Sequence, residues 1–346
     1  MKAPLPFAGA LRSGGALLKH LSKVTPKSPK LTIGLDIGSS AVKVIVLGPR
    51  KALGGRAVIG QQLSPVRQAD EAEIASVIKE AIGTLALPTK AVTLSVSGQW
   101  VIMRVLEMPA VSPTELQQAL PFEAQRYLPF NIQDVVLDGA VLAPAEGNKV
   151  WVLVVACKRD LLERRINWVR QAGFEPSVID VDALALVNAF LEQANGHKAS
   201  GTHALINVGS QWTNLAVLKD GVPYLVRDVP WGAEKLTRQL ADQLGLDEAA
   251  VSSQLTQQVA LTPQLIEAVK VACETLVADL QLSFDFFENR FGPPPEQLMM
   301  SGGVAQQPVF LEALKAHLTQ PVVPWTPGGG LSSQFAIAYG LALRTP

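Results

Sequence analysis

The sequence predicts an α/β protein built from two duplicated halves, with an extra module inserted into the first half. The main observation is an internal repeat, in which LTIGLDIGSSAVKV at residues 31–44 returns as LINVGSQWTNLAV at residues 205–217. Asp36 aligns with Asn207, about half the chain away. The second observation is that apolar runs of strand length alternate with segments whose apolar residues recur at helical spacing. The third is a block at residues 100–172 that interrupts the first half.

The composition fits a two-part globular protein without a nucleic-acid partner. The chain has 346 residues, of which 48% are apolar, so it can bury sizeable cores. Its formal net charge is zero, whereas a nucleic-acid binder usually carries a basic face. Two distant cysteines, Cys157 and Cys273, and four histidines without ligand spacing indicate neither a disulfide framework nor a metal site. No segment approaches the ~18 apolar residues that a membrane span needs.

Residues 1–30 form a basic leader that differs from the rest of the chain. Two interpretations are open: a flexible leader, or an amphipathic anchor to an anionic membrane leaflet or a membrane partner. The leucines between Leu11 and Leu21 favour a short helix, whereas Gly14 and Gly15 weaken it. The leader has no acidic residue, and its cations are Lys2, Arg12, Lys19, Lys23, Lys27 and Lys30.

The first half begins with two apolar runs that predict strands at residues 31–37 and 42–48. A helix is expected near residues 70–86, where isoleucine, valine and leucine recur at helical spacing. Residues 91–97 alternate as a strand does. After the inserted module, residues 175–195 return to the first half as a strand followed by a helix.

The inserted module reads strand, helix, strand, strand, helix. Its first strand covers residues 101–108, and a capping box at Ser112–Glu115 starts the helix that follows. Pro121 lies inside this helix, so we expect a kink or a break there. The remaining elements are strands near residues 134–142 and 149–157 and a helix at residues 159–172, which ends at Gly173.

The second half repeats the hairpin and then becomes largely helical. The repeat spans residues 203–218, and a strand at residues 222–229 leads into the helix of WGAEKLTRQLADQLG. A long helix at residues 263–291 starts at a proline and stops at the Gly-Pro-Pro-Pro run that begins with Gly292. The remaining elements are a strand and glycine turn in QLMMSGGV, a helix near residues 308–319 and a last helix from Ser332 to Leu343.

The two repeated turns are candidate phosphate-binding loops. Small residues let backbone N–H groups approach a phosphate chain, and both hairpins supply such a turn beside a polar side chain. Asp36 would hold Mg²⁺ through water. For Lys43, a role in the site and a solvent-facing strand position are both open. The candidate residues are Asp36, Gly38, Ser39, Ser40 and Lys43 in the first hairpin, Asn207, Gly209, Ser210, Gln211 and Thr213 in the second, and a third glycine turn at Ser301, Gly302 and Gly303.

These turns resemble those of the actin-like ATPase superfamily, whose ribonuclease H-like fold is shared by actin, Hsp70, sugar kinases and FtsA. The chain has neither a P-loop motif nor a dinucleotide-binding GxGxxG motif. The resemblance covers nearly all of the chain after residue 30. It implies ATP and Mg²⁺ as cofactors, with Asp36 and Asn207 holding the metal through water. The implied nucleoside contacts are Gly232, Glu234, Lys235, Gly302 and Gly303.

A narrower resemblance is to the PilM family of type IV pilus assembly. Three segments are similar to signatures of that family: EAQRYLPF at residues 123–130, VVLD at residues 135–138 and the ending FAIAYGLALR at residues 335–344. The inserted module is similar to the SHS2-like subdomain 1C that PilM shares with FtsA. The implied division is a leader at residues 1–30, subdomain 1A at 31–98 and 175–200, 1C at 99–174, 2A at 201–230 and 295–346, and 2B at 231–294.

The resemblance implies a cytoplasmic scaffold that is peripheral at the inner membrane. Members of the family bind ATP and capture the N-terminal tail of a PilN-like membrane protein in a groove between subdomains 1A and 1C. The complex links the membrane platform to pilus motors, and self-assembly is compatible with the fold. The sequence nominates Arg126, Tyr127, Leu128, Pro129 and Phe130 for the groove, while a purely structural role of Tyr127 and Phe130 stays open.

Asn207 departs from the family, whose second phosphate loop usually begins with aspartate. An amide still accepts a hydrogen bond from a metal-bound water, but it carries no charge and is a poor base. We therefore expect nucleotide binding with little or no hydrolysis, which is a scaffold more than an enzyme. Trp212 places a bulky indole in the same loop, where it either enters the core or narrows the phosphate site.

Two alternatives keep the same fold. A small-molecule kinase needs a carboxylate aimed at an acceptor hydroxyl, for which Asp180, Asp182 and Asp228 are the candidates. The 1C-type insertion argues against that alternative. An FtsA-like filament protein would need a membrane anchor, a role that residues 1–30 could take.

Overall fold

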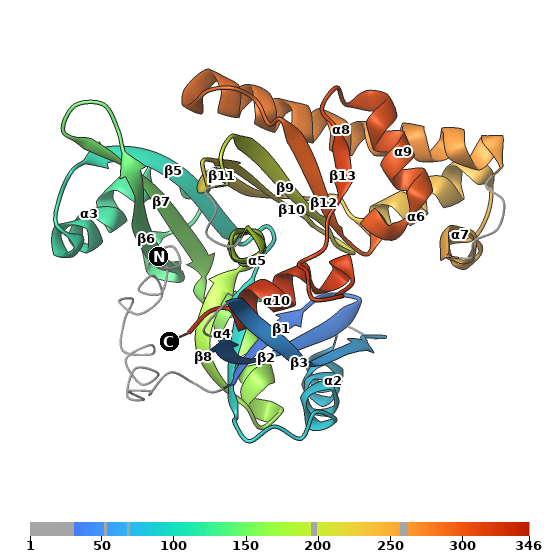
Figure 1. Ribbon diagram of the computed structural model, residues 1–346, viewed down its shortest axis with the longest axis horizontal. Helices are drawn as coiled ribbons and strands as arrows, with labels where there is room; N and C mark the ends of the chain where they lie inside the picture. The colour runs from blue at the N-terminus through green and yellow to red at the C-terminus, as the bar shows by residue number, and fades with distance from the viewer. Residues whose placement is uncertain (1–30, 52–53, 68–69, 195–198, 257–261, 346) are drawn as a thin grey trace.

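The computed structural model describes residues 31–51, 54–67, 70–194, 199–256 and 262–345, and every structural statement concerns these residues. They form two halves with one five-stranded sheet each, and a smaller three-stranded sheet lies to the side (Figure 1). The leader at residues 1–30, predicted as a flexible segment or a membrane anchor, lies outside the described residues. Among the helices that are described, none is both long and apolar enough to cross a membrane.

The first half is a mixed sheet whose three antiparallel strands are followed by two parallel ones. The central strand, β1, is buried along its whole length, as its apolar sequence predicts. Two helices, α2 (Glu71–Gly83) and α4 (Arg159–Gln171), pack against the sheet and against each other. The strand order is β3 (Gly54–Pro65), β2 (Ala41–Lys51), β1 (Thr32–Ile37), β4 (Ala91–Val96) and β8 (Glu175–Val181).

The second half repeats this arrangement, which confirms the predicted duplication. Its sheet again joins three antiparallel strands to two parallel ones. The strand order is β11 (Val222–Val229), β10 (Thr213–Lys219), β9 (Thr202–Val208), β12 (Gln297–Gly302) and β13 (Val322–Pro324). The helices of this half are α6 (Ala233–Leu244), α7 (Glu248–Thr256), α8 (Pro263–Phe291) and α9 (Pro308–His317).

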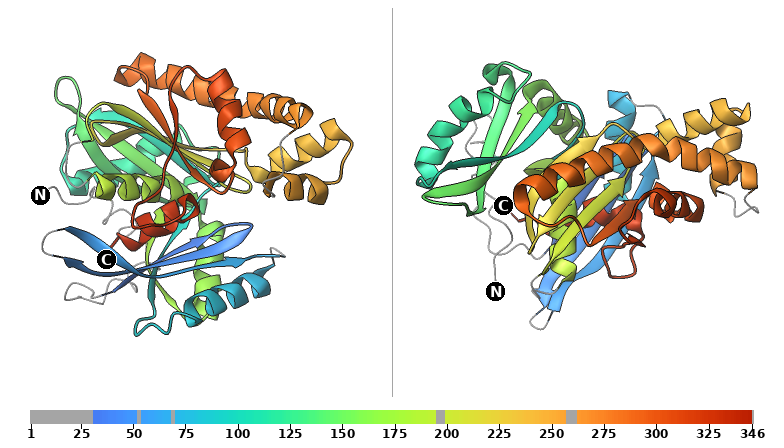
Figure 2. Two further views of the ribbon diagram at one scale, coloured as in Figure 1. Left: turned by 45° about the vertical axis from the view of Figure 1, so that its right-hand side comes forward. Right: turned by 90° about the horizontal axis from the view of Figure 1, so that it is seen from above.

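The inserted module is a three-stranded antiparallel sheet, in the order β5, β7, β6, with one helix. One sheet face joins the main core, and helix α3 covers part of the other face. Figure 2 shows the module beside the two halves, on the side away from α7. Helix α4 contacts β7 of the module as well as the first sheet. The module elements are β5 (Val101–Pro109), α3 (Pro113–Gln125), β6 (Val135–Pro144) and β7 (Lys149–Lys158).

Two helices lie between the sheets and contact each other (Figure 1): α5 (Asp182–Gln193) and α10 (Ala336–Ala342). Helix α10 follows the second sheet in the chain but packs on β1 and β2 of the first. Glycines allow this approach, because a Cβ on Gly34 would lie 2.0 Å from the Ala338 carbonyl oxygen. A Cβ on Gly340 would lie 1.8 Å from the carbonyl oxygen of Ala185. Small residues therefore join the two halves.

The structure corrects one local expectation and adds three elements. Of the kink or break expected at Pro121, the break is wrong, because α3 continues to Gln125 and buries Leu116, Leu120 and Ala124 on one face. Burial of that face offsets the single hydrogen bond that proline removes. The elements that the pattern does not predict are β3, which is rich in glycine and glutamine, the short helix α7 and the three-residue strand β13.

Candidate functional site

The first repeated turn joins β1 to β2 and is closed by its glycine. The Gly38 N–H donates to the Ala41 carbonyl over 3.1 Å, and a Cβ on Gly38 would lie 2.9 Å from that oxygen. Asp36 is buried at the end of β1 and accepts a hydrogen bond from the Lys43 ammonium at 2.9 Å. Only 17% of the Lys43 side chain is exposed. Of the two interpretations of Lys43, the structure favours the position beside the turn over the solvent-facing one.

The second turn has the same closure but different side chains. The Gly209 N–H donates to the Trp212 carbonyl over 2.9 Å. The strand register places Asn214 opposite Asn207, as it places Lys43 opposite Asp36 in the first hairpin. An amide pair, joined at 3.1 Å, therefore stands where the first hairpin has an ion pair.

The amide pair continues into a chain of polar groups that crosses the second sheet. The Asn214 amide donates to the Asp228 carboxylate over 2.8 Å. The Ser301 hydroxyl donates to the Asn207 side-chain oxygen over 3.2 Å. The other Asp228 oxygen accepts the backbone N–H of Gly98, which belongs to the first half, over 2.7 Å. These bonds fix the orientation of Asn207 and connect the two halves.

The N-terminus of α6 rests on the second turn. The Glu234 carboxylate accepts bonds from the Ser210 hydroxyl at 2.8 Å and from the Gln211 amide at 3.2 Å. Gly232 is required here, because a Cβ would lie 2.3 Å from the Ser210 carbonyl oxygen. The N–H groups of Ala233 and Glu234, the first two of α6, donate to the Gly209 and Ser210 carbonyls over 3.0 Å and 2.9 Å. The hydroxyl of Thr213 points elsewhere, since it donates to the Trp231 carbonyl over 2.8 Å.

The third glycine turn follows β12. Gly302 has a φ of 95°, and a Cβ there would lie 2.2 Å from the Val208 carbonyl oxygen at the end of β9. Ser333, in the turn before α10, donates to the Gly302 carbonyl over 3.0 Å. A Cβ on Gly303 would meet no atom within 4 Å, so the backbone beside this residue is open to a flat ligand.

A carboxylate from α5 lies between the two repeated turns. Asp182 is the first residue of α5, and the Ser95 hydroxyl donates to it. Burial raises the pKa of Asp182, and the nearby carboxylates of Asp36 and Asp228 raise it further. Burial also raises the pKa of Asp228, although the Gly98 N–H and the Asn214 amide oppose the shift. Acidic groups from both halves thus meet at one point.

The third kinase candidate, Asp180, is not part of this group. Its carboxylate lies 2.9 Å from the guanidinium of Arg344, and both residues are buried. The Val181 N–H also donates to it over 2.9 Å. Asp180 therefore anchors the end of the described chain to β8, and only Asp182 and Asp228 of the three candidates face the turns.

The buried carboxylates of Asp36, Asp182 and Asp228 form a candidate site for a cation that also binds oxygen atoms of a nucleotide. Within the described residues, no three His, Cys, Asp or Glu side chains are arranged to bind a metal. Mg²⁺ normally uses one or two carboxylates together with water and phosphate oxygens. The donors present therefore fit Mg²⁺ that arrives with a nucleotide, with Asp36 on one side and the uncharged Asn207 on the other.

Two contacts at this site were not predicted from the sequence. The indole of Trp212 packs against Gly98, where a Cβ would lie 3.1 Å from the ring, so this tryptophan crosses between the halves. Arg165 of α4 donates to the Ile37 carbonyl, directly before the first turn, over 2.7 Å. Gly98 has a φ of 95°, and a glycine directly after a predicted strand is the one sequence feature that indicates a tight turn there. No sequence feature indicates the contact between Arg165 and Ile37.

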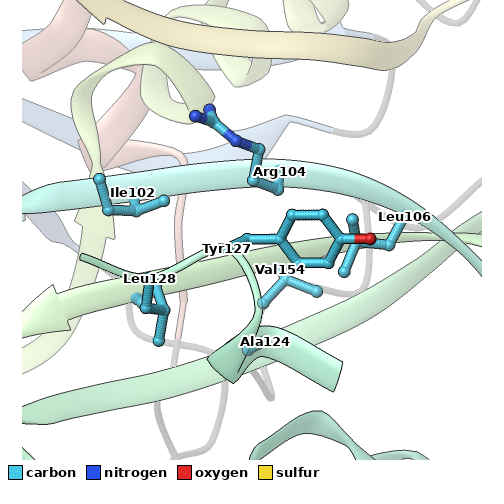
Figure 3. A pocket seen from close by; sticks show the side chains of 8 residues that line it. Ile102, Arg104, Leu106, Ala124, Tyr127, Leu128 and Val154 are labelled. Carbon is cyan, nitrogen blue, oxygen red and sulfur yellow. The ribbon is translucent and has the colours of Figure 1, made fainter. Parts of the chain in front are cut away.

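A second candidate region is a pocket on the side of the module sheet that α3 leaves partly open. Tyr127 and Leu128 of the nominated segment line it together with strands β5 and β7 (Figure 3). Tyr127 is 48% exposed, so it is not a core residue. Arg126 points away, since it pairs at 3.9 Å with Glu123 on the surface. The lining residues are Ile102, Arg104, Leu106, Ala124, Tyr127, Leu128, Val154 and Ala156.

Aromatic residues extend this pocket along the same sheet face. Trp100 and Phe130 lie with ring centroids 5.8 Å apart. The Lys158 ammonium lies 4.6 Å from the Trp100 ring and 5.2 Å from the Phe130 ring. Strand alternation places Lys158, the last residue of β7, on the pocket side with Ala156, and Trp100, directly before β5, contacts the Lys158 ammonium there. We call the pocket and these three residues the module groove.

Comparisons with known proteins agree on family and fold. A family model described as type IV pilus assembly protein PilM matches residues 34–327. A chain in the solved PilM-PilN type IV pilus biogenesis complex is similar, with a TM-score of 0.80 and 25% identity, over 91% of this chain and 98% of that chain.

More distant structures share the fold alone. Ethanolamine utilization protein EutJ from Carboxydothermus hydrogenoformans has a TM-score of 0.54 at 14% identity, with 97% of this chain and 99% of that chain covered. MreB5 of Spiroplasma citri, solved with ADP, has a TM-score of 0.51 at 10% identity, with 91% and 95% covered. The expected actin-like ATPase fold is thereby confirmed.

Proposed function

Because the chain belongs to the type IV pilus assembly protein PilM family, we propose that it is an ATP-binding scaffold of the inner-membrane pilus platform. In this role it captures the cytoplasmic tail of a PilN-like membrane protein and hydrolyses ATP slowly or not at all. It reaches the membrane through that partner and presents a surface to the pilus motors. The observation that carries the proposal is the pair of matching turns that face one buried acidic group.

The two turns are proposed to hold the phosphates by the backbone N–H groups of Ser39, Ser40, Ser210 and Gln211, since those of Gly38 and Gly209 close the turns. Lys43 would leave its ion pair with Asp36 to contact a phosphate, and Asp36 would then hold Mg²⁺ through water. The nucleoside would lie between the start of α6, with Glu234 and Lys235, and the open backbone of the third glycine turn.

We expect slow hydrolysis because the side chains available to activate the attacking water, Asn207 and Asp182, are poor bases. Asn207 is uncharged, and its amide is held by Asn214 and Ser301. Asp182 is the carboxylate that could act as a general base for the attacking water. Its raised pKa leaves part of it protonated near neutral pH, and a protonated carboxyl cannot act as a base. A missing carboxylate that orders metal and water costs orders of magnitude in rate, whereas the backbone donors for binding are intact.

We propose the module groove as the site for the tail; its residues all lie between 99 and 174, so this site is within the implied subdomain 1C, whereas the resemblance implies a groove between 1A and 1C. The apolar floor and exposed aromatic residues of the module groove suit an extended apolar peptide, and Lys158 suits an acidic or carbonyl group beside it. Support also comes from the similar chain in the PilM-PilN complex, which binds the partner named there. We propose the same class of partner for this chain.

The first experiment is to purify the protein with Mg²⁺, denature it and identify the released nucleotide by chromatography. Stoichiometric ATP is the expected result. Released ADP would show that hydrolysis persists and would contradict the role assigned to Asn207. If no nucleotide is released, a titration with ATP decides, and the absence of saturable binding would overturn the ATP-binding role.

The tail site is tested with a peptide of the first ~20 residues of the PilN-like protein from the same organism. Tyr127→Ala should weaken peptide binding about tenfold or more, since buried aromatic anchors contribute most to such interfaces. Phe122→Ala is the matched control, because Phe122 lies near the end of α3, five residues before Tyr127, is 76% exposed and does not line the groove. Equal losses in both variants would contradict the assignment.

A further inference from the structure

Trp212 is the largest residue of the second turn, and its main chain is part of the turn. The Gly209 N–H donates to the Trp212 carbonyl over 2.9 Å, so the backbone of Trp212 closes the loop that contains Ser210 and Gln211. The next residue, Thr213, is buried and starts β10. A displacement of Trp212 therefore displaces the backbone donors of the second turn as well.

The indole of Trp212 leaves its own half and lies on Gly98 of the first half. A Cβ on Gly98 would lie 3.1 Å from the ring atoms Cε2 and Nε1, so the ring packs directly on the glycine backbone. Gly98 is buried, and its φ of 95° is rarely adopted by residues that carry a side chain. The same glycine donates its N–H to Asp228 of the second half over 2.7 Å. One residue of the first half thus makes two contacts with the second half.

The halves also meet along α5 and α10, where glycines permit backbone contact. Gly34 of β1 and Gly340 of α10 supply the space there. These contacts lie within a strand and a helix, whereas the contact with Gly98 is made by a residue of the second turn. The Trp212 indole is therefore placed to hold that turn against the first half.

We propose that Trp212 is a positioning residue that fastens the second turn to the first half and thereby slows the release of bound nucleotide. This role rests on the nucleotide site of the proposed function. A ligand whose phosphates are held by both turns leaves when the turns separate, and separation exposes the face of the indole that lies on Gly98. Exposure of that apolar surface costs free energy. Removal of the indole therefore speeds dissociation and has little effect on the entry of nucleotide between separated turns.

The test measures the association and dissociation rate constants of N-methylanthraniloyl-ATP with Mg²⁺ on the full chain, with the fluorophore excited directly. In Trp212→Ala the dissociation rate constant should rise about tenfold or more, as expected for the loss of a well-packed aromatic contact. The association rate constant should stay within about twofold, because such losses fall mainly on dissociation. Trp212→Phe keeps an aromatic ring and should raise the dissociation rate constant less.

The matched control is Trp151→Ala, which should release nucleotide at the unmodified rate. Trp151 also joins two parts of the chain, because it packs on Tyr224 and Phe291 of the second half with ring centroids 6.4 Å and 5.1 Å away. The strand register places Tyr224 near Leu218, at the end of β10 remote from the second turn. Faster release in Trp151→Ala, equal to that in Trp212→Ala, would show a general loosening and would overturn the specific role of Trp212.

A substitution on the opposite side of the contact tests whether the indole acts through Gly98. The added methyl group of Gly98→Ala would lie 3.1 Å from the ring and should also speed release. The double variant with Trp212→Ala should release nucleotide no faster than the faster single variant, because both changes break one contact. Independent effects that multiply in the double variant would overturn the role of this contact.

The outcomes separate the role of Trp212 from the proposed function. Unchanged dissociation in Trp212→Ala, with saturable binding, would overturn the positioning role and leave the ATP-binding role intact. If Trp212→Ala does not fold, as judged by urea unfolding, unchanged release in both Trp212→Phe and Gly98→Ala would overturn it instead. Absence of saturable binding to the unmodified protein would overturn the proposed function and the role of Trp212 with it.

Discussion

Equivalent positions of the two hairpins hold different pairs of side chains. The first hairpin opposes Asp36 and Lys43, and the second opposes Asn207 and Asn214. A buried carboxylate needs a cation close by, and Lys43 supplies it at 2.9 Å. A buried amide needs only hydrogen bonds, and its neighbours supply these. The site is therefore electrostatically asymmetric, with its metal-holding charge on the side of the first half.

Restoring a carboxylate in the second hairpin should restore hydrolysis. For Asn207→Asp we expect at least a tenfold increase in phosphate release from ATP with Mg²⁺, because an added base is typically worth ~10²–10⁴-fold. Ser301 still donates to the residue at this position. Asn207→Ala is the control for altered packing and should show no increase. Equal rates in all three proteins would contradict the assigned role of position 207.

Asp138 of β6 should make the protein less stable as the pH rises. Burial raises the pKa of Asp138 to about 7, although the Gly139 N–H and the Gln117 amide oppose the shift, and Oδ2 has no partner among the described residues. The folded protein therefore holds a proton that the unfolded chain releases above about pH 4. The contribution of Asp138 to the free energy of unfolding is therefore fully present below that pH and is lost as the pH rises from about 4 to about 7, by up to roughly 4 kcal/mol.

The measurement for Asp138 is urea unfolding at pH 5 and pH 8. Asp138→Asn keeps the shape without the charge, so the stability difference between variant and unmodified protein should be larger at pH 8. Asp134→Asn, at an exposed position of the same module, serves as the control and should give a small difference at both pH values. A pH-independent difference for Asp138→Asn would refute the prediction.

At the scale of the elements, α10 packs so closely against α5 that only glycine fits at the contact. Gly340→Ala should destabilise the protein by roughly 1–3 kcal/mol, because the added Cβ would lie 1.8 Å from the backbone of α5. Gly83→Ala, at the end of α2, meets no atom within 4 Å and should change stability by less than about 1 kcal/mol. Urea unfolding of both variants provides the comparison, and similar values would contradict the packing argument.

The buried ion pair between Asp180 and Arg344 makes a second prediction at this scale. Arg344→Met leaves a buried carboxylate without its cation and should cost roughly 3–5 kcal/mol, whereas combining it with Asp180→Asn should recover much of the loss. Arg170→Met, which breaks an exposed pair with Glu175, should cost less than about 1 kcal/mol. Denaturant unfolding of the three variants tests the order.

The sequence predicts most elements because apolar periodicity reports directly on which face is buried. It does not predict β3, since glycine and glutamine in that strand carry little periodicity. It predicts a kink or a break at Pro121, and the helix does not break, because local propensity cannot weigh the burial of Leu116 and Leu120. The hairpin repeat indicates the two turns, but the contact of Trp212 with Gly98 depends on how the halves meet, which no local pattern encodes.

For the molecule as a whole, the site joins both halves, so nucleotide should stabilise them together. At 100 times its dissociation constant, ATP should raise the free energy of unfolding by about 2.7 kcal/mol. The transition should stay single, because the proposed ligand contacts come from both halves, which already meet at Asp228 and Gly98. Two resolved transitions of which ATP shifts only one would contradict a shared site. Differential scanning calorimetry with and without Mg-ATP measures both quantities.

The position of α10 has a consequence for synthesis on the ribosome. Thr32 of β1 donates to the Ala342 carbonyl of α10 across 310 residues of chain. At typical elongation rates of ~5–20 residues per second, the first sheet waits roughly 15–60 s for the helix that covers it. During that interval its apolar surface is open to nascent-chain chaperones, and the first half cannot complete its core until the last helix has left the exit tunnel.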